Sequence, residues 1–212
     1  GIDPDDYPCD ETRENYAVFL AKASWKVKNL KGAVDVAREA GIPLKVMGNR
    51  DLPFHLNRFF APSRGSTWVP TWKGVSYYGM LSDDEKKRIL RKAKVLIFPV
   101  RWHEPFGLAI TEAMASGCGV LGTPYGSLPE IITPETGFLS QRKSELVKAL
   151  QNRIFDPRQC RQRVYQGFTH LQMAQSYLEK YRQVLNEGFL HPPQTKIHYL
   201  GNQAAENLLP WE

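Results

Sequence analysis

Short apolar runs and helical patterns alternate along this chain. Runs with the length of buried strands occupy residues 16–21, 43–47, 75–78, 95–99, 119–123 and 137–139. Between most of them, apolar residues recur at the three- and four-residue spacing of helices. This order predicts an α/β fold, because parallel strands need a crossover that a helix usually supplies. We expect a Rossmann-like doubly wound parallel sheet of about six strands, with the C-terminal helices packing on it.

Signals at the helix ends sharpen the predicted boundaries. Asn29 is a suitable cap for a helix over 30–40, and Gly41 is suited to ending it. Ser82 and Glu85 have the spacing of a capping box at the start of the next helix. These signals favour helices joined to the strands by short loops.

The remaining stretches define the expected domain limits. Residues 1–14 are polar and irregular, and we interpret them as a linker or hinge. Residues 15–188 form the expected domain, in which 157–188 carries one or two helices. Residues 189–212 remain as a C-terminal tail, which includes two consecutive prolines.

Composition narrows the class of protein. The 212 residues carry a net charge of +6, which allows anionic ligands, anionic lipid or nucleic acid without choosing among them. Three widely spaced cysteines indicate neither a disulfide framework nor a metal cluster. No apolar run has the length of a transmembrane helix, and no signal peptide opens the chain. We expect a cytoplasmic protein. Peripheral attachment to an anionic membrane remains an alternative.

The stretch 100–122 carries the clearest candidate chemistry. Glu104 lies in a loop after a buried strand, and Pro105 suits the first turn of a helix. The pattern becomes helical from about Phe106, and Glu112 lies inside this helix. Two carboxylates eight residues apart therefore flank a helix N-terminus, which is an anion site.

This arrangement suits a diphosphate. Backbone N–H groups at Phe106, Gly107 and Leu108 would provide fixed dipoles, and Gly107 lets the backbone approach a phosphate closely. Lys22 and Lys28 follow the first strand and would add positive charge.

The two acids would then contact the groups on either side of the diphosphate. Glu112 would accept hydrogen bonds from ribose hydroxyls, and Glu104 would reach the next group, such as a sugar. A nucleoside diphosphate-sugar of the UDP or GDP type has this order of parts.

Each candidate also has an ordinary structural interpretation. Two glutamates at this spacing often lie on a solvated surface, and so do lysines in a lysine-rich run. The charged helix around Lys86 favours exposure of that side chain to solvent. His103 is either a sugar contact or a plain loop histidine.

Other apparent motifs do not fit their contexts. The glycine pattern at 117–122 leaves a helix and enters a strand, the reverse of the dinucleotide-binding order. Asp3 and Asp5 lie in the linker without a preceding strand, so we expect no metal site there. His103 and Glu104 lack the second histidine of a zinc protease motif.

Two stretches remain undetermined. Within 51–73 we expect at most a short helix at 56–60, and residues 196–200 resemble a strand. The first stretch holds an aromatic and basic set that suits a packed loop better than nucleic-acid binding, so we expect no nucleic-acid partner. This set comprises Arg58, Arg64, Trp68 and Trp72.

The run E-P-F-G-L-A-I-T-E-A-M-A-S-G at 104–117 resembles the E-x₇-E motif of retaining glycosyltransferases of family 4, which have the GT-B fold. G-I-D-P at 1–4 resembles the sequence motif at the start of the second domain of these enzymes. Lys22 and Lys28 resemble their basic pair, in which arginine is commoner at the first position. V-S-Y-Y-G-M-L at 75–81, G-S-L-P-E at 126–130 and T-G-F-L at 136–139 follow in the family's order.

The resemblance implies residue roles. Glu104 would contact the donor sugar, and Glu112 the ribose. Lys22 and Lys28 would stabilise the leaving diphosphate without a metal or other cofactor, and Leu108 would pack beside it. Leu81 would bind the base through its backbone, with Lys86 nearby. Roles for Ser127 and Glu130 stay less defined.

The resemblance covers most of the chain but only one of the two GT-B domains. The partner domain, which carries the acceptor site, would come from the same parent chain or from another polypeptide. We therefore expect this chain to bind the donor and to transfer little sugar by itself. A sugar-nucleotide epimerase of the same fold, and a non-catalytic nucleotide-binding or interaction module, remain alternatives.

Overall fold

Parallel strands form the centre of the molecule. The computed structural model describes residues 1–48, 73–190 and 208–212, and within them the sheet has six strands. They are β1 (Ala17–Leu20), β2 (Leu44–Met47), β3 (Val75–Gly79), β4 (Val95–Phe98), β5 (Gly119–Gly122) and β6 (Gly137–Leu139). Their order is β3-β2-β1-β4-β5-β6, and every neighbouring pair is parallel. The predicted sheet is therefore confirmed.

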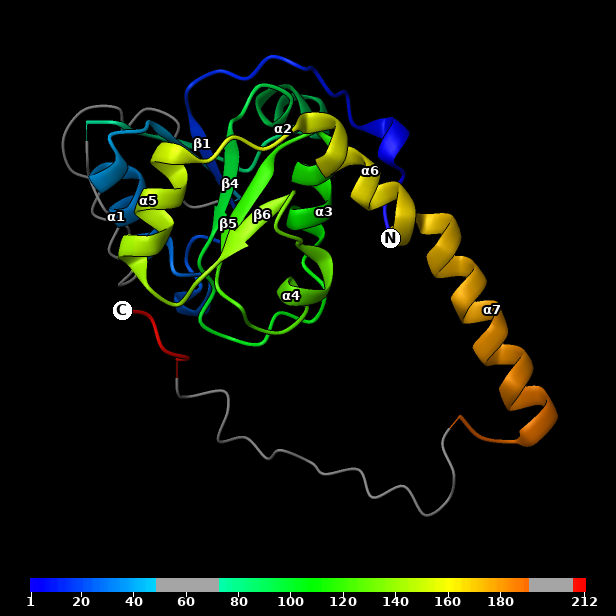
Figure 1. The fold of residues 1–212 in the computed structure, drawn as a ribbon. Helices are drawn as coiled ribbons and strands as arrows, with labels where there is room; N and C mark the ends of the chain where they lie inside the picture. Colours follow the sequence, from blue (N-terminus) through cyan, green and yellow to red (C-terminus); the bar gives the residue numbers. More distant parts are fainter. Residues whose placement is uncertain (49–72, 191–207) are drawn as a thin grey trace.

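Helices cover both faces of this sheet. They are α1 (Leu30–Ala40), α2 (Asp83–Leu90), α3 (Leu108–Ala115), α4 (Leu128–Ile131), α5 (Lys143–Asn152), α6 (Pro157–Gly167) and α7 (His170–Glu187). α1 and α5 pack side by side on one face, whereas α3 lies on the other with α6 against it (Figure 1). All four residues of the central strand β4 are consequently buried, as is typical of a parallel sheet with two covered faces.

The capping signals work as predicted, with one difference at α3. The Asn29 side chain accepts a hydrogen bond from the Gly32 N–H, and Ser82 and Glu85 form a complete capping box. The third helix, expected from about Phe106, begins at Leu108. The reason is Gly107, whose φ of +84° places it in the left-handed region outside the helix. The segment between β5 and β6 also contains α4, a single helical turn.

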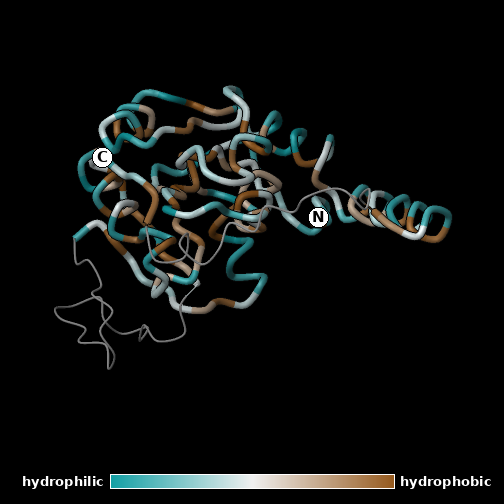
Figure 2. Tube along the Cα trace, turned by 90° about the horizontal axis from the view of Figure 1, so that it is seen from below, coloured by the Kyte–Doolittle hydropathy of each residue, from teal (hydrophilic) through white to brown (hydrophobic). Residues whose placement is uncertain are grey.

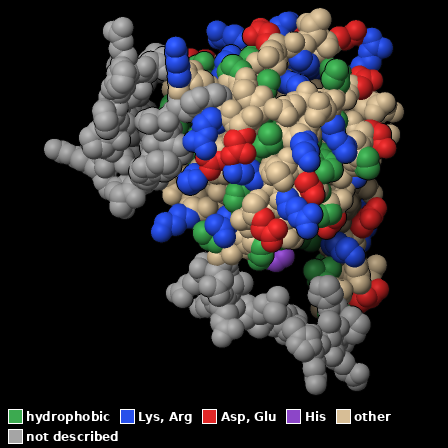
Figure 3. Space-filling view, turned by 60° about the vertical axis from the view of Figure 1, so that its left-hand side comes forward, with side chains coloured by type: hydrophobic (Ala, Val, Ile, Leu, Met, Phe, Trp, Pro, Cys, Tyr) green, Lys and Arg blue, Asp and Glu red, His purple; other side chains and the backbone are tan. Residues whose placement is uncertain are grey.

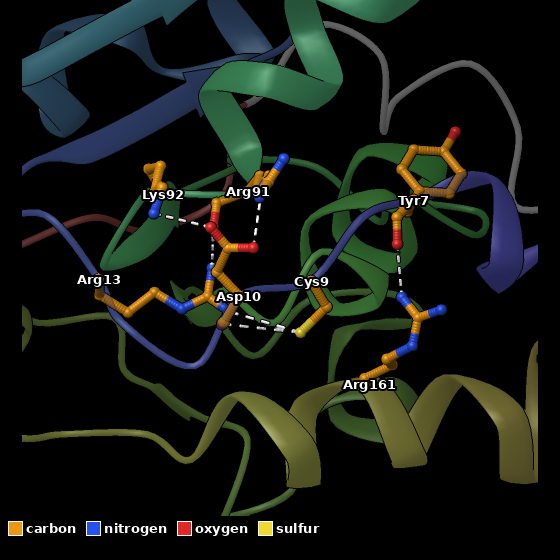
Figure 4. A network of polar contacts seen from close by, with 7 residues as sticks. All are labelled: Tyr7, Cys9, Asp10, Arg13, Arg91, Lys92 and Arg161. Carbon is orange, nitrogen blue, oxygen red and sulfur yellow. Dashed lines mark hydrogen bonds and ion pairs between the residues drawn. The ribbon is translucent and has the colours of Figure 1, made fainter.

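The N-terminal segment packs against the domain although it is largely irregular. Ile2 and Tyr7 are buried, and Ile2 forms a parallel bridge with Thr169. Asp10 forms ion pairs with Arg91 and Lys92, each at 2.7 Å (Figure 4). The 3-10 turn Pro4–Asp6 is the regular element in this segment.

Helix α7 differs from the other long helices in its surroundings. It projects away from the sheet and its covering helices (Figure 1), and none of its residues is buried. Brown and teal segments alternate along it in Figure 2, because apolar residues recur at helical spacing. In the described part of the chain, no helix has the length and apolar character needed to cross a membrane. The possible helix at 56–60, the aromatic and basic set beside it and the strand-like run at 196–200 lie outside the described residues.

Candidate functional site

The strand order places the candidate residues at one edge of the sheet. β1 and β4 are neighbours, and the chain moves outward from them in opposite directions. In such a sheet, ligands bind beyond the carboxyl ends of these two strands. The segment after β1 carries Lys22 and Lys28, and the segment after β4 carries Glu104.

Glu104 is a buried carboxylate held by two donors. Its Oε2 atom accepts hydrogen bonds from Lys28 Nζ at 2.5 Å and from Trp102 Nε1 at 2.8 Å. Lys28 Nζ also lies 4.7 Å from the centroid of the Trp102 ring, a cation–π distance. Lys28 and Glu104 thus form a buried ion pair, and the positive charge expected at the diphosphate is partly compensated by the acid.

The loop that carries Glu104 depends on a second loop behind it. The Ser127 N–H donates to the Glu104 carbonyl oxygen at 2.9 Å, and Ser127 Oγ donates to the Phe106 carbonyl oxygen at 2.8 Å. A Cβ on Gly126 would lie 2.3 Å from the Glu104 backbone nitrogen. Ser127 therefore has a clear structural role, whereas Glu130 is exposed.

Glu112 is held in a similar way. Its Oε1 atom accepts hydrogen bonds from Lys86 Nζ at 3.0 Å and from the Tyr7 hydroxyl at 3.1 Å. Burial by itself lowers the pKa of Lys86, but the hydrogen bond and charge of Glu112, followed by those of Asp83, outweigh burial and raise the pKa above its usual value. The side chain of Lys86 is only 17% exposed, so the expectation of a solvated lysine was wrong. The ion pair with Glu112 is the physical reason.

The N-terminus of α3 lies between the two acids in the sequence. Gly107 precedes the helix without any side-chain cap, which leaves N–H groups of the first turn available to a ligand. A Cβ at Gly107 would meet Ile110 Cδ1 at 2.8 Å and Glu104 Cγ at 3.3 Å. Leu108, the first helical residue, is 54% exposed and borders this position.

The other predicted residues are less closely connected. Lys22 is exposed, and its Nζ lies 4.9 Å from the centroid of the Trp25 ring. His103 is also exposed, with its ring edge-on to Tyr125. Leu81 is half-buried just before α2.

The structure therefore brings Glu104 together with Lys28, and Glu112 together with Lys86. The Phe106 ring packs against the Phe168 ring, with a centroid distance of 6.2 Å.

Two residues of this site were absent from the sequence-based prediction. Trp102 lies two positions before Glu104, and an indole so close to a candidate acid was a signal within the motif itself. Tyr7 lies 105 residues from Glu112 in the sequence, within a segment interpreted as a linker. No local pattern connects that tyrosine with the acid.

The sheet order, with its switch point between β1 and β4, defines a doubly wound α/β domain. Residues 11–169 match the family model described as "Glycosyl transferases group 1". The chain belongs to this family, which confirms the resemblance seen in its motifs.

Curated relatives share parts of this sequence. The phosphatidyl-myo-inositol mannosyltransferase of Propionibacterium freudenreichii is 26% identical over 102 residues, which are 46% of this chain and 27% of that protein. The serotype-specific mannosyltransferase WbdA of Escherichia coli is 41% identical over 56 residues, which are 26% of this chain and 7% of that protein.

Solved structures share the fold. AviGT4, a glycosyltransferase involved in avilamycin A biosynthesis, has a TM-score of 0.68 at 20% identity, over 87% of this chain and 57% of that chain. Sucrose-phosphate synthase from Thermosynechococcus elongatus has a TM-score of 0.67 at 21% identity, over 88% of this chain and 52% of that chain. The C-terminal domain of a group 1 glycosyl transferase from Francisella tularensis is covered completely, with a TM-score of 0.55 at 18% identity over 80% of this chain. This chain thus spans about half the length of the first two structures and less of the curated relatives.

Proposed function

We propose that this chain binds the donor of a retaining glycosyltransferase, a nucleoside diphosphate-sugar of the UDP or GDP type. One observation carries the proposal: two acids of one motif flank an uncapped helix N-terminus at the switch point, and each is held by a lysine and an aromatic donor. Such sites suit a ligand with an anionic centre and hydroxyl groups on both sides.

Each part of the donor has a matching group in this proposal. The N–H groups at the start of α3 bind the diphosphate, with Leu108 beside it. Glu112 accepts hydrogen bonds from the ribose, and Glu104 from hydroxyls of the sugar, with His103 as a further sugar contact. Leu81 contacts the base through its backbone.

The chemical step depends on electrostatic stabilisation. The glycosidic bond to the diphosphate breaks, and negative charge grows on the leaving group while the sugar becomes oxocarbenium-like. Lys22 is the free cation of this arrangement, because it forms no ion pair with any described residue. Lys28 holds Glu104 and adds positive charge at short range. The two lysines thereby stabilise the negative charge of the leaving diphosphate, which a metal ion would otherwise do.

The acceptor would bind to a separate domain. The uncovered apolar residues of α7, among them Tyr177, Leu178 and Tyr181, offer a surface for such a domain. Lys, Arg, Asp and Glu side chains are intermixed on the α1–α5 side (Figure 3), so attachment to an anionic membrane would draw on a modest net positive charge.

Titration calorimetry with UDP, GDP and ADP tests donor binding. We expect one of these nucleotides to bind, Glu112→Ala to abolish binding, and Glu179→Ala on exposed α7 to leave it unchanged. Failure of all three nucleotides to bind the wild-type chain would overturn the proposal.

A second experiment tests transfer. When the acceptor domain is supplied, Glu104→Gln should remove donor turnover but leave nucleotide affinity within about threefold, because Glu104 faces the sugar. Nucleotide binding without turnover by the complete wild-type protein would indicate a binding module instead.

A further inference from the structure

Tyr7 connects the N-terminal segment with the acid assigned to the ribose. Its hydroxyl donates to Glu112 Oε1 at 3.1 Å, although the two residues lie 105 positions apart. The tyrosine is 8% exposed, so its ring is fixed by packing. This contact belongs to neither the family motif nor any of the predicted roles.

The hydrogen bonds of Glu112 are unequal between its two oxygens. Oε1 accepts hydrogen bonds from both Tyr7 and Lys86, whereas no described residue donates to Oε2. A carboxylate oxygen can accept two hydrogen bonds, so Oε2 keeps its full capacity for a ligand. The protein thereby fixes one oxygen and leaves the other available.

Tyr7 is anchored to the same helix that carries Glu112. The Arg161 guanidinium donates to the Tyr7 carbonyl oxygen (Figure 4) and, at 2.7 Å, to the carbonyl oxygen of Ala115, the last residue of α3. Tyr7 is therefore tied to α3 at two levels, by its hydroxyl at Glu112 and by its backbone near the end of the helix. Such a double attachment restricts the rotation of the carboxylate.

The chemistry of Tyr7 suits this task. Burial, and then the charge of Glu112, raise the pKa of its phenol, so the hydroxyl keeps its proton and donates. Lys86 alone would hold the acid less firmly, because its ammonium also pairs with Asp83 at 3.1 Å. The neutral tyrosine has no such competing carboxylate bond within the described residues.

We infer that Tyr7 is a positioning residue for nucleotide binding: it holds Glu112 Oε1 so that Oε2 accepts a hydrogen bond from a ribose hydroxyl. This inference rests on the proposed function. It also assigns a ligand-binding role to the irregular segment before β1.

The test compares nucleotides with and without ribose hydroxyls. Titration calorimetry measures the binding of UDP, GDP and ADP and of their 2′,3′-dideoxy counterparts to the wild type and to Tyr7→Phe. For the nucleotide that binds, Tyr7→Phe should weaken affinity by about tenfold, the size of one hydrogen bond to a charged group. The affinity of the dideoxy counterpart should change less than about twofold, because it has no hydroxyl for Glu112 to accept from.

Tyr16→Phe is the matched control. Tyr16 is equally buried at 6% exposed, but its hydroxyl donates to the Ile89 carbonyl oxygen. We expect this variant to bind both nucleotides as the wild type does. Thermal unfolding of both variants shows that each is folded, since each loses one oxygen atom and keeps its ring.

The outcomes separate the inference from the proposed function. Wild-type binding that Tyr7→Phe leaves unchanged, or weakens equally for both nucleotides, overturns the inference alone. Failure of the wild type to bind any nucleotide overturns the proposed function, and the inference with it.

Discussion

At the scale of single residues, the two acids of the motif share one pattern of contacts. Glu104 and Glu112 each present one oxygen to a lysine and to an aromatic donor. The lysines differ in their partners, because Lys28 pairs with Glu104 alone among the described residues, whereas Lys86 also pairs with the exposed Asp83. Loss of the cation should therefore leave Glu104 without an ion-pair partner among the described residues.

Lys28→Met should destabilise the fold, because it leaves the Glu104 carboxylate buried without its cation. We expect a loss of about 3 kcal/mol in the free energy of unfolding, measured by urea denaturation. The control is Lys31→Met, whose exposed ammonium pairs with Asp35 and whose loss should cost less than about 1 kcal/mol.

A double variant isolates the cause of that loss. Glu104→Gln in the Lys28→Met background removes the unpaired charge, and it should restore much of the lost stability. Equal stability losses in Lys28→Met and Lys31→Met would contradict the burial of the Lys28–Glu104 pair.

Alkaline pH should destabilise the folded state through the buried cysteines. Burial raises the pKa of the Cys118 and Cys160 thiols to about 12 from an ordinary value of 9.0. Above about pH 9 the unfolded chain has lost protons that the folded chain retains, so stability falls as pH rises towards 12. Each thiol contributes up to about 1.4 kcal/mol per pH unit in this window.

The contribution of one thiol is measured by comparison with Cys118→Ala. Urea unfolding between about pH 9 and 11 should show that the free energy of unfolding falls less steeply with pH in this variant than in the wild type. The reason is that the variant lacks the Cys118 thiol, whose proton the folded wild type retains. The same dependence on pH in both proteins would contradict the linkage to Cys118.

At the scale of elements, helix ends and loops follow from local chemistry to different degrees. Asn29, Gly41 and the Ser82–Glu85 pair predicted helix ends correctly, because capping is decided by residues within one turn. The predicted start of α3, at about Phe106, was wrong by about two residues. Pro105 suits a helix start, but the left-handed Gly107 that follows it delays the helix.

Gly126→Ala should distort the loop that holds Glu104. The added Cβ would lie 2.3 Å from both the backbone nitrogen and the carbonyl oxygen of Glu104, at a φ of +62°. We expect a loss of about 3 kcal/mol or more in unfolding free energy, together with weaker nucleotide binding.

Gly41→Ala separates the two physical causes of that loss. Gly41 has a similar φ of +72°, but no atom of the described residues lies within 4 Å of its added Cβ. Only the backbone strain remains, so the expected cost is about 1 kcal/mol. Equal losses in the two variants would show that the contact with Glu104 is unimportant.

At the scale of the whole molecule, burial divides the chain into a packed domain and a projecting helix. The sheet and its covering helices enclose the core, whereas α7 has no buried residue. Its apolar residues therefore contribute little to folding of the described part. They are available for contact with another surface.

A pair of leucine substitutions measures this division. Leu178→Ala on α7, where the leucine is 48% exposed, should change the unfolding free energy by less than about 0.5 kcal/mol. Leu146→Ala on α5, where the leucine is fully buried, should cost about 3 kcal/mol. A large loss in Leu178→Ala would show that α7 is covered in solution.

The sequence by itself determined the succession of strands and helices, the family and the two motif acids. These are local properties, since hydrophobic period, capping and motif spacing act within a few residues. The exposure expected for Lys86 was wrong for the same reason, because a charged helix does not reveal which neighbour lies opposite.

Only the tertiary structure decided how the acids are held. Lys28 and Glu104 are 76 residues apart, and Tyr7 and Glu112 are 105 apart. Their contacts depend on the placement of β1 beside β4 and on the packing of the N-terminal segment against α3 and α6. Trp102, two positions before Glu104, is the one donor that lies within the motif. Both lysines and Tyr7 reach their acids from other elements, so no local pattern contains those contacts.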